Sequence, residues 1–488
     1  MATVTFSPPF RFSPISSFPS KFRTRTRFII PPLSSLTPRA ALSDPFVLEI
    51  AQTLEDSVST PSPSSLPPPP LQKLRDTSSE SILSMSWPTR KDEPFRFIDT
   101  SFIKQSRIHP IPIPSPSSDL AGISSDTQFP SLVIVDGHIV PSASQLSGFP
   151  DGVYVGSISG ISSEAIMEKV LQLVSDFHDG DLFWSLNGIG APDVTVIFVP
   201  AGCQVEKPLH LRFYSREGGE IGSNYMPLSS PRVLVLVEKG GEIGIIEEYS
   251  GGDADKCYWA NSVIQLALEE EAKIHHSYIQ AQTASAAHIK WTFVRQESSS
   301  NYELVEISAG GKLSRHNLHV QQVGPDTITE LSAFHLSVSD QTQDLHSRLV
   351  LDHPRGYSRQ LHKSIVAHSS GQAVFDGNIK VNRYAQQTDA GQLTKNLLLE
   401  PRATVNVKPN LQIIADDVKC SHGAAISDLE EDQIFYFQAR GIDLETTRKA
   451  LVFAFGSEVV ERLPYNSLKK KVQSHVKALL ETTSGGAP

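Results

Sequence analysis

The chain has 488 residues, of which 39% are hydrophobic, and a formal net charge of −10. Its length suffices for one large domain with smaller flanking parts, and its acidic balance argues against a nucleic-acid binder. It contains no apolar run of about 18 residues or more, so we expect no membrane insertion. The three cysteines, Cys203, Cys257 and Cys420, are scattered, which is typical of a reducing compartment and too few for a self-contained four-cysteine cluster site.

The first 43 residues differ from the rest of the chain because they contain arginines, serines and prolines but neither Asp nor Glu. This composition is typical of an organelle transit peptide. Their one apolar cluster, residues 28–30, is too short for a secretory signal. We therefore expect residues 1–43 to be a plastid transit peptide that directs the protein to the chloroplast stroma. A mitochondrial leader and a disordered basic tail are the alternatives.

Residues 44–190 are predicted to form an N-terminal helical and mixed region with Pro-rich linkers. A helix is expected from Asp44 to Val58, with Asp44 as N-cap and Pro45 in the first turn. Pro-rich segments follow at 61–70 and at about 110–130. A second helix is expected at 162–177, because apolar residues recur there at helical spacing after two serines.

Residues 191–427 are predicted to form a β domain. Short runs of β-branched and apolar residues alternate there with Gly, Pro, Asn and Asp, and helical periodicity is almost absent. Such a pattern fits a sandwich, a barrel or a β-solenoid. No repeat of fixed length is evident, but the length of the region and its few hairpin signals favour the solenoid.

Residues 428–488 are predicted to form a C-terminal helical domain. Asp428 and Glu431 resemble a capping box, and Asp443 is expected to cap a helix that runs to about Leu463. A final helix is expected at 465–480. The helix that Asp443 is expected to cap has an apolar stripe that must be covered, either by the end of its own β domain or by a partner. The stripe consists of Leu451, Phe455, Val459 and Leu463.

Motifs for nucleotide binding and hydrolysis are incomplete or missing. Residues 310–313 (Gly-Gly-Lys-Leu) superficially resemble a phosphate loop, but Leu313 replaces the hydroxyl residue that would hold magnesium. Asp416 and Asp417 are adjacent, so on a strand they would point to opposite faces and could not act together as acid and base. We therefore expect no enzymatic activity.

Histidines are concentrated in the β domain, where eleven of the sixteen lie between His275 and His422. For most of them a structural role is expected, because their spacing defines no tetrahedral metal site. Cys420 and His422 differ, since residues i and i+2 of a strand project from the same face. A thiolate beside an imidazole suits iron or zinc. Two ligands cannot close a site, so the pair is either inert or completed by a second chain.

Several long motifs resemble the SufB/SufD family of iron–sulfur cluster assembly proteins, from about residue 80 to the C-terminus. The segment 88–97 (PTRKDEPFRF) favours the SufD branch, although Phe95 stands where Trp is more usual. Ser427 is a further departure, where glycine is common. The remaining motifs lie at 368–379 (HSSGQAVFDGNI), 385–392 (AQQTDAGQ), 396–399 (NLLL), 408–413 (KPNLQI), 415–424 (ADDVKCSHGA) and 435–442 (FYFQARGI).

The resemblance implies a mainly β protein with a right-handed parallel β-helix core, flanked by N-terminal and C-terminal helical regions. It implies a non-catalytic scaffold subunit of the SufBCD complex that pairs with SufB through the β-helices. It also implies that the C-terminal helical domain binds the SufC ATPase. A nascent iron–sulfur cluster would be held transiently at the SufB interface, where Cys420 and His422 are candidate ligands and His422 is the more probable functional residue.

Two other classes of protein are considered beside this one. Parallel β-helices also include polysaccharide-acting enzymes, which need clustered carboxylates or an arginine base in an exposed groove. The chain could instead be a solitary metal-binding module.

Overall fold

The computed structural model describes residues 44–58, 67–112, 128–177, 179–220, 222–252 and 256–484. The predicted transit peptide and much of both Pro-rich segments lie outside these residues. Within the described ranges, none of the helices combines the length and apolar content that a membrane crossing requires.

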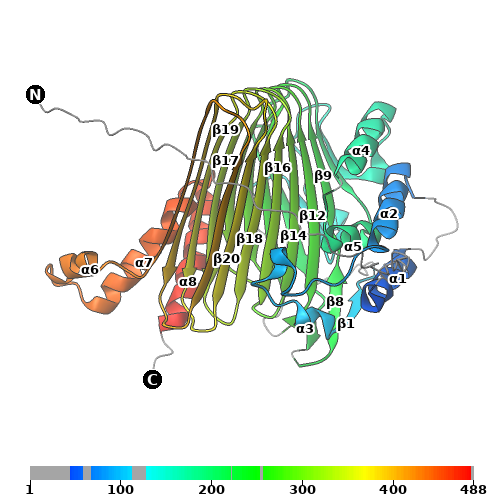
Figure 1. The fold of residues 1–488 in the computed structure, drawn as a ribbon. Helices are drawn as coiled ribbons and strands as arrows, with labels where there is room; N and C mark the ends of the chain where they lie inside the picture. The colour runs from blue at the N-terminus through cyan, green and yellow to red at the C-terminus, as the bar shows by residue number, and fades with distance from the viewer. Residues whose placement is uncertain are drawn as a thin grey trace, which may run out of the picture. The chain divides into compact units, whose positions relative to one another are not determined.

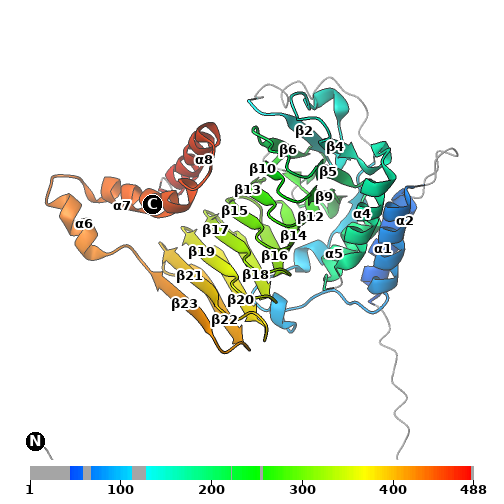
Figure 2. The same ribbon diagram turned by 90° about the horizontal axis from the view of Figure 1, so that it is seen from above.

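Two long sheets form the body of the protein (Figures 1 and 2). Sheet A contains β4 (Tyr154–Ser157), β5 (Thr195–Val199), β9 (Arg232–Val237), β12 (Trp259–Leu268), β14 (Ala287–Gln296), β16 (Leu313–Gln322), β18 (Thr342–Leu351), β20 (Gln372–Val381) and β22 (Thr404–Ile413), and near β12 also β8 (Tyr225–Ser229) and β1 (Arg107–Pro110). Sheet B contains β3 (His138–Ile139), β2 (Ser131–Val135), β6 (Leu209–Ser215), β10 (Glu242–Gly251), β13 (Lys273–Ala281), β15 (Asn301–Ser308), β17 (Ile328–Ser337), β19 (Tyr357–Val366), β21 (Thr388–Leu398) and β23 (Val418–Ser427). The short strands β7 (Gly219–Glu220) and β11 (Lys256–Cys257) pair separately.

From β12 onward the chain alternates between the two sheets, and each strand pairs in parallel with the strand two positions later. This arrangement is a parallel β-helix, so the predicted fold class is confirmed. The turns differ in length: Leu313 lies beside Ala287, 26 residues earlier, whereas Thr404 lies beside Gln372, 32 residues earlier. The variable length explains why the sequence shows no repeat of fixed period.

One corner of each turn repeats the same local structure. A residue with positive φ donates its backbone N–H to a carbonyl of the next turn, as Asp326 does to Pro354 at 3.2 Å and Arg355 to Gln386 at 2.9 Å. Because Glu, Arg and Gln rarely adopt this left-handed conformation, the stacked turns must impose it at their positions. The residues concerned are Glu271, Ser299, Asp326, Arg355 and Gln387.

Helices cover the outer face of sheet A near its N-terminal end (Figure 2). As predicted, the chain forms α1 (Pro45–Val58), where Asp44 accepts the N–H of Phe46, and α4 (Glu164–Asp176), where Ser163 accepts that of Ile166. Helices α2 and α3 were not predicted from the sequence, and α2 begins inside the expected Pro-rich linker. The remaining elements are α2 (Pro69–Ile82), α3 (Ser101–Lys104), α5 (Leu182–Gly190), η1 (Glu93–Phe95), η3 (Pro141–Ala143) and η4 (Ile158–Gly160).

The C-terminal segment forms α6 (Glu431–Gln438), α7 (Leu444–Val460) and α8 (Asn466–Ser484). Asp443 caps α7 as predicted, but the expected capping box is wrong. Glu430 is the N-cap of α6, without a side-chain bond, and the Asp428 carboxylate accepts the N–H of Leu429 at 2.7 Å. Asp428 lies too far ahead of the first turn to reach its N–H groups.

The helices α7 and α8 pack on the outer face of sheet B, and this contact covers much of the predicted apolar stripe. Val459 and Leu463 are buried beside Phe334, and Lys363 lies 3.9 Å from the centre of the Phe455 ring. Two ion pairs add to the contact: Lys363 with Glu458, and Lys471 with Glu248, both at 2.6 Å. The stripe therefore stabilises the protein's own fold, which decides between the two alternatives.

Because of its buried histidines, we expect the protein to become less stable in acid. Burial lowers the pKa of His288 to about 3 and that of His319 to about 4. The unfolded chain, with pKa values of ~6.5, then binds more protons, so their stabilisation is complete above pH ~6.5 and is lost as pH falls toward 4 and 3. We expect the free energy of unfolding to fall by about 2 kcal/mol per histidine between pH 7.5 and 5. Urea titrations of the wild type and His319→Gln check this, and an equal decrease in both proteins would contradict the role of His319.

Candidate functional site

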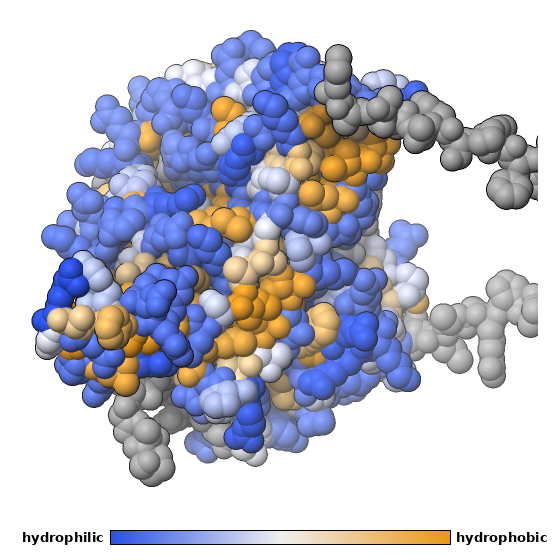
Figure 3. All heavy atoms as spheres, turned by 60° about the vertical axis from the view of Figure 1, so that its left-hand side comes forward, coloured by the Kyte–Doolittle hydropathy of each residue, from blue (hydrophilic) through white to orange (hydrophobic). Residues whose placement is uncertain are grey.

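The C-terminal end of the β-helix is open. Strands β22 and β23 each pair on one side only, and no further strand among the described residues covers their outer edges. Ile413, Ile414 and Ile426 are 46%, 53% and 50% exposed at this end. Figure 3 brings this side of the molecule forward and shows hydrophobic patches within a hydrophilic surface. Unpaired backbone groups beside exposed apolar side chains favour the addition of another strand.

Cys420 and His422 lie on β23 at this open end. In the register with β21, Cys420 is beside Ala390 and His422 is beside Gln392, and both of these neighbours are buried. The two side chains therefore continue a row that faces the interior of the β-helix, with Cys420 packed against the core and His422 exposed. The strand spacing thus places them on one face, as expected.

The pair does not form a complete metal site within this chain. Among the described residues there is no group of three or more His, Cys, Asp or Glu side chains that could hold a metal ion. Burial raises the pKa of Cys420, and the charge of Asp389 raises it further, so the thiol keeps its proton at neutral pH. Binding a metal would therefore require this thiol to lose its proton, and two side chains alone would not complete a four-ligand site.

Histidines of the β-helix interior bind two buried glutamates that sequence reasoning did not single out. Glu247 contacts His276 at 2.9 Å and also the ammonium of Lys290. Glu306 contacts His316 at 2.8 Å and His335 at 3.0 Å. Burial alone would raise the pKa of both glutamates, but the neighbouring Lys and His groups lower it below the usual value. Both carboxylates are thus held ionised inside the β-helix, and no spacing rule in the sequence predicts their partners.

A segment of the N-terminal region, residues 88–98, crosses the outer face of sheet A toward the open end. We call it the strap. Arg315 anchors it by donating to the carbonyl of Pro94 at 2.9 Å and by stacking on Phe95 at 4.2 Å. The carboxylate of Glu93 reaches the ammonium of Lys408 on the edge strand β22. Residues from opposite ends of the sequence therefore meet at the edge.

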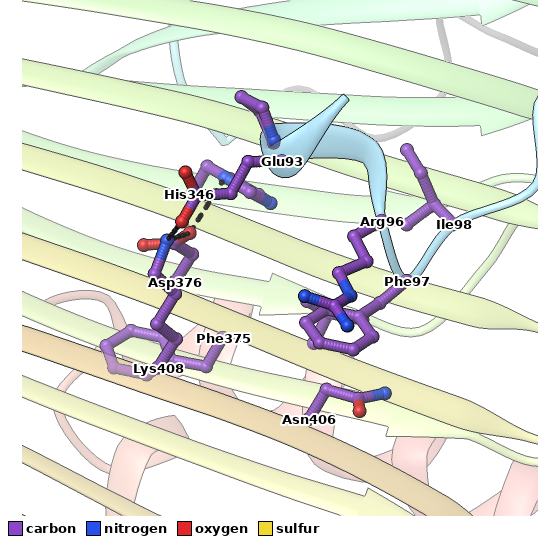
Figure 4. Close-up of a pocket in the computed structure, with 11 residues that line it drawn as sticks. Glu93, Arg96, Phe97, Ile98, His346, Phe375, Asp376, Asn406 and Lys408 are labelled. Atoms are coloured by element: carbon purple, nitrogen blue, oxygen red, sulfur yellow. Dashed lines mark hydrogen bonds and ion pairs between the residues drawn. The ribbon is translucent and has the colours of Figure 1, made fainter. Parts of the chain in front are cut away.

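A pocket of about 150 Å³ lies between the strap and strands β18, β20 and β22 (Figure 4). Lys408, Asp376 and His346 form one wall, where Lys408 lies 3.4 Å from Asp376. Arg96 and Phe97 of the strap and Asn406 of β22 also line the pocket. No sequence motif predicted this pocket, because its lining comes from segments far apart in the chain.

The helix α6 has no buried residue, and two aromatic side chains on it are open to solvent. Phe435 is 72% exposed and Tyr436 is 53% exposed. Figure 2 shows α6 standing apart from the stacked strands. Exposed aromatic side chains on a projecting helix are typical of a protein-binding surface.

Comparisons with known proteins cover nearly the whole described structure. A family model described as the SUF system FeS cluster assembly, SufBD core domain, matches residues 221–455, and the SufBD protein N-terminal region matches residues 64–211. The chain is 59% identical over 446 residues to Protein ABCI7, chloroplastic, of Arabidopsis thaliana, a match that spans 91% of this chain and 93% of that protein.

Two bacterial relatives match over similar lengths. An iron–sulfur cluster assembly SufBD family protein of Synechocystis is 33% identical, over 83% of this chain and 90% of its own length. The iron–sulfur cluster assembly protein SufD of Escherichia coli is 29% identical, over 81% and 90%. The similarity therefore includes the strap, the β-helix and its open edge.

Proposed function

The chain belongs to the SufB/SufD family of iron–sulfur cluster assembly proteins, and from this we propose that it is a non-catalytic scaffold subunit of a SufBCD-type complex. In this complex the open end of its β-helix pairs with a SufB-like subunit, and its C-terminal helical domain binds a SufC-like ATPase. The nascent cluster is the cargo, shared with the partner for a limited time. The similarity to a relative named chloroplastic, together with the acid-free residues 1–43, supports a plastid location.

The observation that carries this proposal is the open edge formed by β22 and β23. Each strand presents a row of backbone groups without a strand partner among the described residues, beside partly buried apolar side chains such as Val407 and Leu411. A second β-helix would satisfy the backbone groups and cover the apolar rows in one contact. Cys420 and His422 then lie at the joint, where a partner can supply the missing ligands.

The ATPase contact is assigned to α6 rather than to the stripe on α7. The stripe is used in packing on sheet B, whereas Phe435 and Tyr436 are exposed. The proposal therefore locates SufC binding on the exposed part of the C-terminal domain.

The alternative functions have little support in the structure. Asp416 and Asp417 lie exposed in the turn between β22 and β23, so they do not form a carboxylate pair in a groove. A solitary metal-binding module would need a complete ligand set, and the described residues do not provide one.

The pairing edge is tested by placing charges on it. The double variant Ile413→Asp/Ile426→Asp should lower the affinity for the SufB-like subunit at least ~100-fold, because unpaired carboxylates would be buried at the joint. Its fold should change little, since both side chains are half exposed. Leu83→Asp, at an exposed position on the N-terminal side, is the matched control. Calorimetric binding measurements decide, and an unchanged affinity of the double variant would rule out this edge as the pairing surface.

The ATPase dock is tested on α6. Phe435→Ala/Tyr436→Ala should abolish co-purification with the SufC-like subunit and leave pairing with the SufB-like subunit intact, because only exposed aromatic surface is removed. Tyr225→Ala, at a half-exposed position at the start of β8, is the control. If the double variant keeps its ATPase, the contact lies elsewhere on the C-terminal domain.

The role of the Cys-x-His pair is tested in the assembled complex. His422→Ala should cost about 1 kcal/mol of stability or less, because the side chain is exposed, yet it should strongly reduce cluster absorbance per complex. Cys420→Ser nearly preserves the side-chain volume and reports on the thiol separately. Iron and sulfide contents at the wild-type level in His422→Ala complexes would exclude it as a ligand.

A further inference from the structure

The pocket beneath the strap opens at the edge where the proposed partner strand would be added. Asn406 and Lys408 are on the edge strand β22 and line the pocket on the outer face of sheet A. A strand added to β22 would lie about 4.8 Å away. Its outward side chains beside Asn406 and Lys408 would therefore stand at the mouth of the pocket.

Three ionisable side chains, His346, Asp376 and Lys408, follow one another along one row of sheet A as it approaches this edge. In the parallel register His346 is beside Asp376, and Asp376 is beside Lys408. The neighbours interact, with His346 at 3.9 Å and Lys408 at 3.4 Å from the Asp376 carboxylate. Opposite charges in directly neighbouring positions stabilise a sheet. The next position in the row, which no strand of the described residues fills, therefore suits an acidic side chain.

The strap adds a second cation at the same place. Arg96 lines the pocket, with its guanidinium 5.9 Å from the centre of the Phe97 ring, and it forms no close ion pair with the residues that the structure describes, although its charge contributes to lowering the pKa of Glu93. In contrast, the other charged groups of the pocket, Lys408, Glu93, Asp376 and His346, are already paired with one another. Figure 4 shows Arg96 and Phe97 on one side of the pocket and this paired group on the other.

The edge strands themselves contain no acidic residue. The sequence of β22 is TVNVKPNLQI and that of β23 is VKCSHGAAIS, so their ionisable groups are Lys408, Lys419, Cys420 and His422. Strand-to-strand pairing with a second copy of this chain would place only neutral or basic side chains beside Lys408. Like charges across a joint lower affinity, so such an edge disfavours its own copy.

We propose that this edge selects a partner strand with an acidic side chain opposite Lys408, whose carboxylate Lys408 and Arg96 receive, and that it thereby discriminates against self-pairing. The inference rests on the proposed pairing through β22 and β23. It adds the chemistry of the partner strand and the residues that recognise it.

The test measures the affinity of the full chain for the SufB-like subunit at two salt concentrations. Arg96→Gln and Lys408→Gln should each weaken binding about tenfold and reduce its salt dependence. Lys380→Gln is the matched control, because Lys380 faces outward on β20, one strand from the edge. Since Lys408 also binds Glu93, urea unfolding checks its fold, and Arg96, which forms no close ion pair within the described part of the chain, provides the decisive comparison.

A charge exchange identifies the acid on the partner. With Arg96→Glu in this chain, a Lys substitution at one acidic residue of the partner's pairing edge should restore binding, whereas substitutions at the others should not. The full chain alone should self-associate at least ~10-fold more weakly than it binds the partner. A homodimer of equal affinity that Ile413→Asp dissociates would overturn the proposal.

The binding measurements distinguish an error in the proposed pairing from an error in the proposed recognition of an acid. If the wild-type chain does not bind the SufB-like subunit, the proposed pairing is wrong. If it binds, but Arg96→Gln and Lys408→Gln bind as the wild type does, only the recognition of an acid is wrong. Acetate binding to Arg96 in the isolated chain, with normal pairing of both variants, would show a small-anion site and would also overturn the proposal.

Discussion

Parallel stacking of successive turns is the constraint on which the rest of the structure depends. Between its two ends, each strand of the β-helix satisfies its backbone groups with the turn before and the turn after, and even the left-handed corner residues bond to the next turn. At the N-terminal end, the short antiparallel strands β3 and β4 and the nearby helices complete the sheets. At the C-terminal end nothing in the described chain does so. The unfinished end is therefore a direct consequence of the fold, and it coincides with the motifs around Cys420 and Lys408.

The interior of the β-helix contains ionised side chains as well as apolar ones. Glu247 and Glu306 are fully buried and are held by His and Lys groups from other strands, and Glu247 also accepts a hydrogen bond from Tyr249 of its own strand. Removing one partner would leave a buried charge unpaired, which costs about 3–5 kcal/mol. These contacts cross between turns, so they fix the register of one turn on the next as well as satisfying the charges. Three of the eleven histidines that are concentrated in this region, His276, His316 and His335, are used in this way.

The strap couples the two ends of the sequence to the open edge. Its anchor, Arg315, is itself buried and paired with Asp344 at 2.6 Å, so the strap is attached to the body of sheet A. From there it brings Glu93 to Lys408 and places Arg96 beside the edge strand. In the pairing proposed above, the joint would be mostly apolar with a small charged site at its rim, where hydrophobic contact would provide area and the cations would provide selection.

Much of this protein could be predicted from local sequence. Helix α1 follows from Asp44 and Pro45, α7 follows from Asp443, and the shared face of Cys420 and His422 follows from the two-residue period of a strand. Periodicity alone left a sandwich, a barrel and a solenoid open. The resemblance to a family decided for the β-helix, because turns of 26 to 32 residues leave no constant repeat in the sequence.

Only the tertiary structure determined which distant residues meet. Glu93 and Lys408 are 315 residues apart, and Glu247 and Lys290 are 43 apart, so no local pattern links them. The same reason explains why the stripe on α7 could not be assigned from sequence: an amphipathic helix shows that one face is covered, but not by what. Local sequence determines an element and the face that it buries. The register of the stacked turns determines which distant residues the element contacts, and it places Arg96, Lys408 and His422 at the open end of the β-helix.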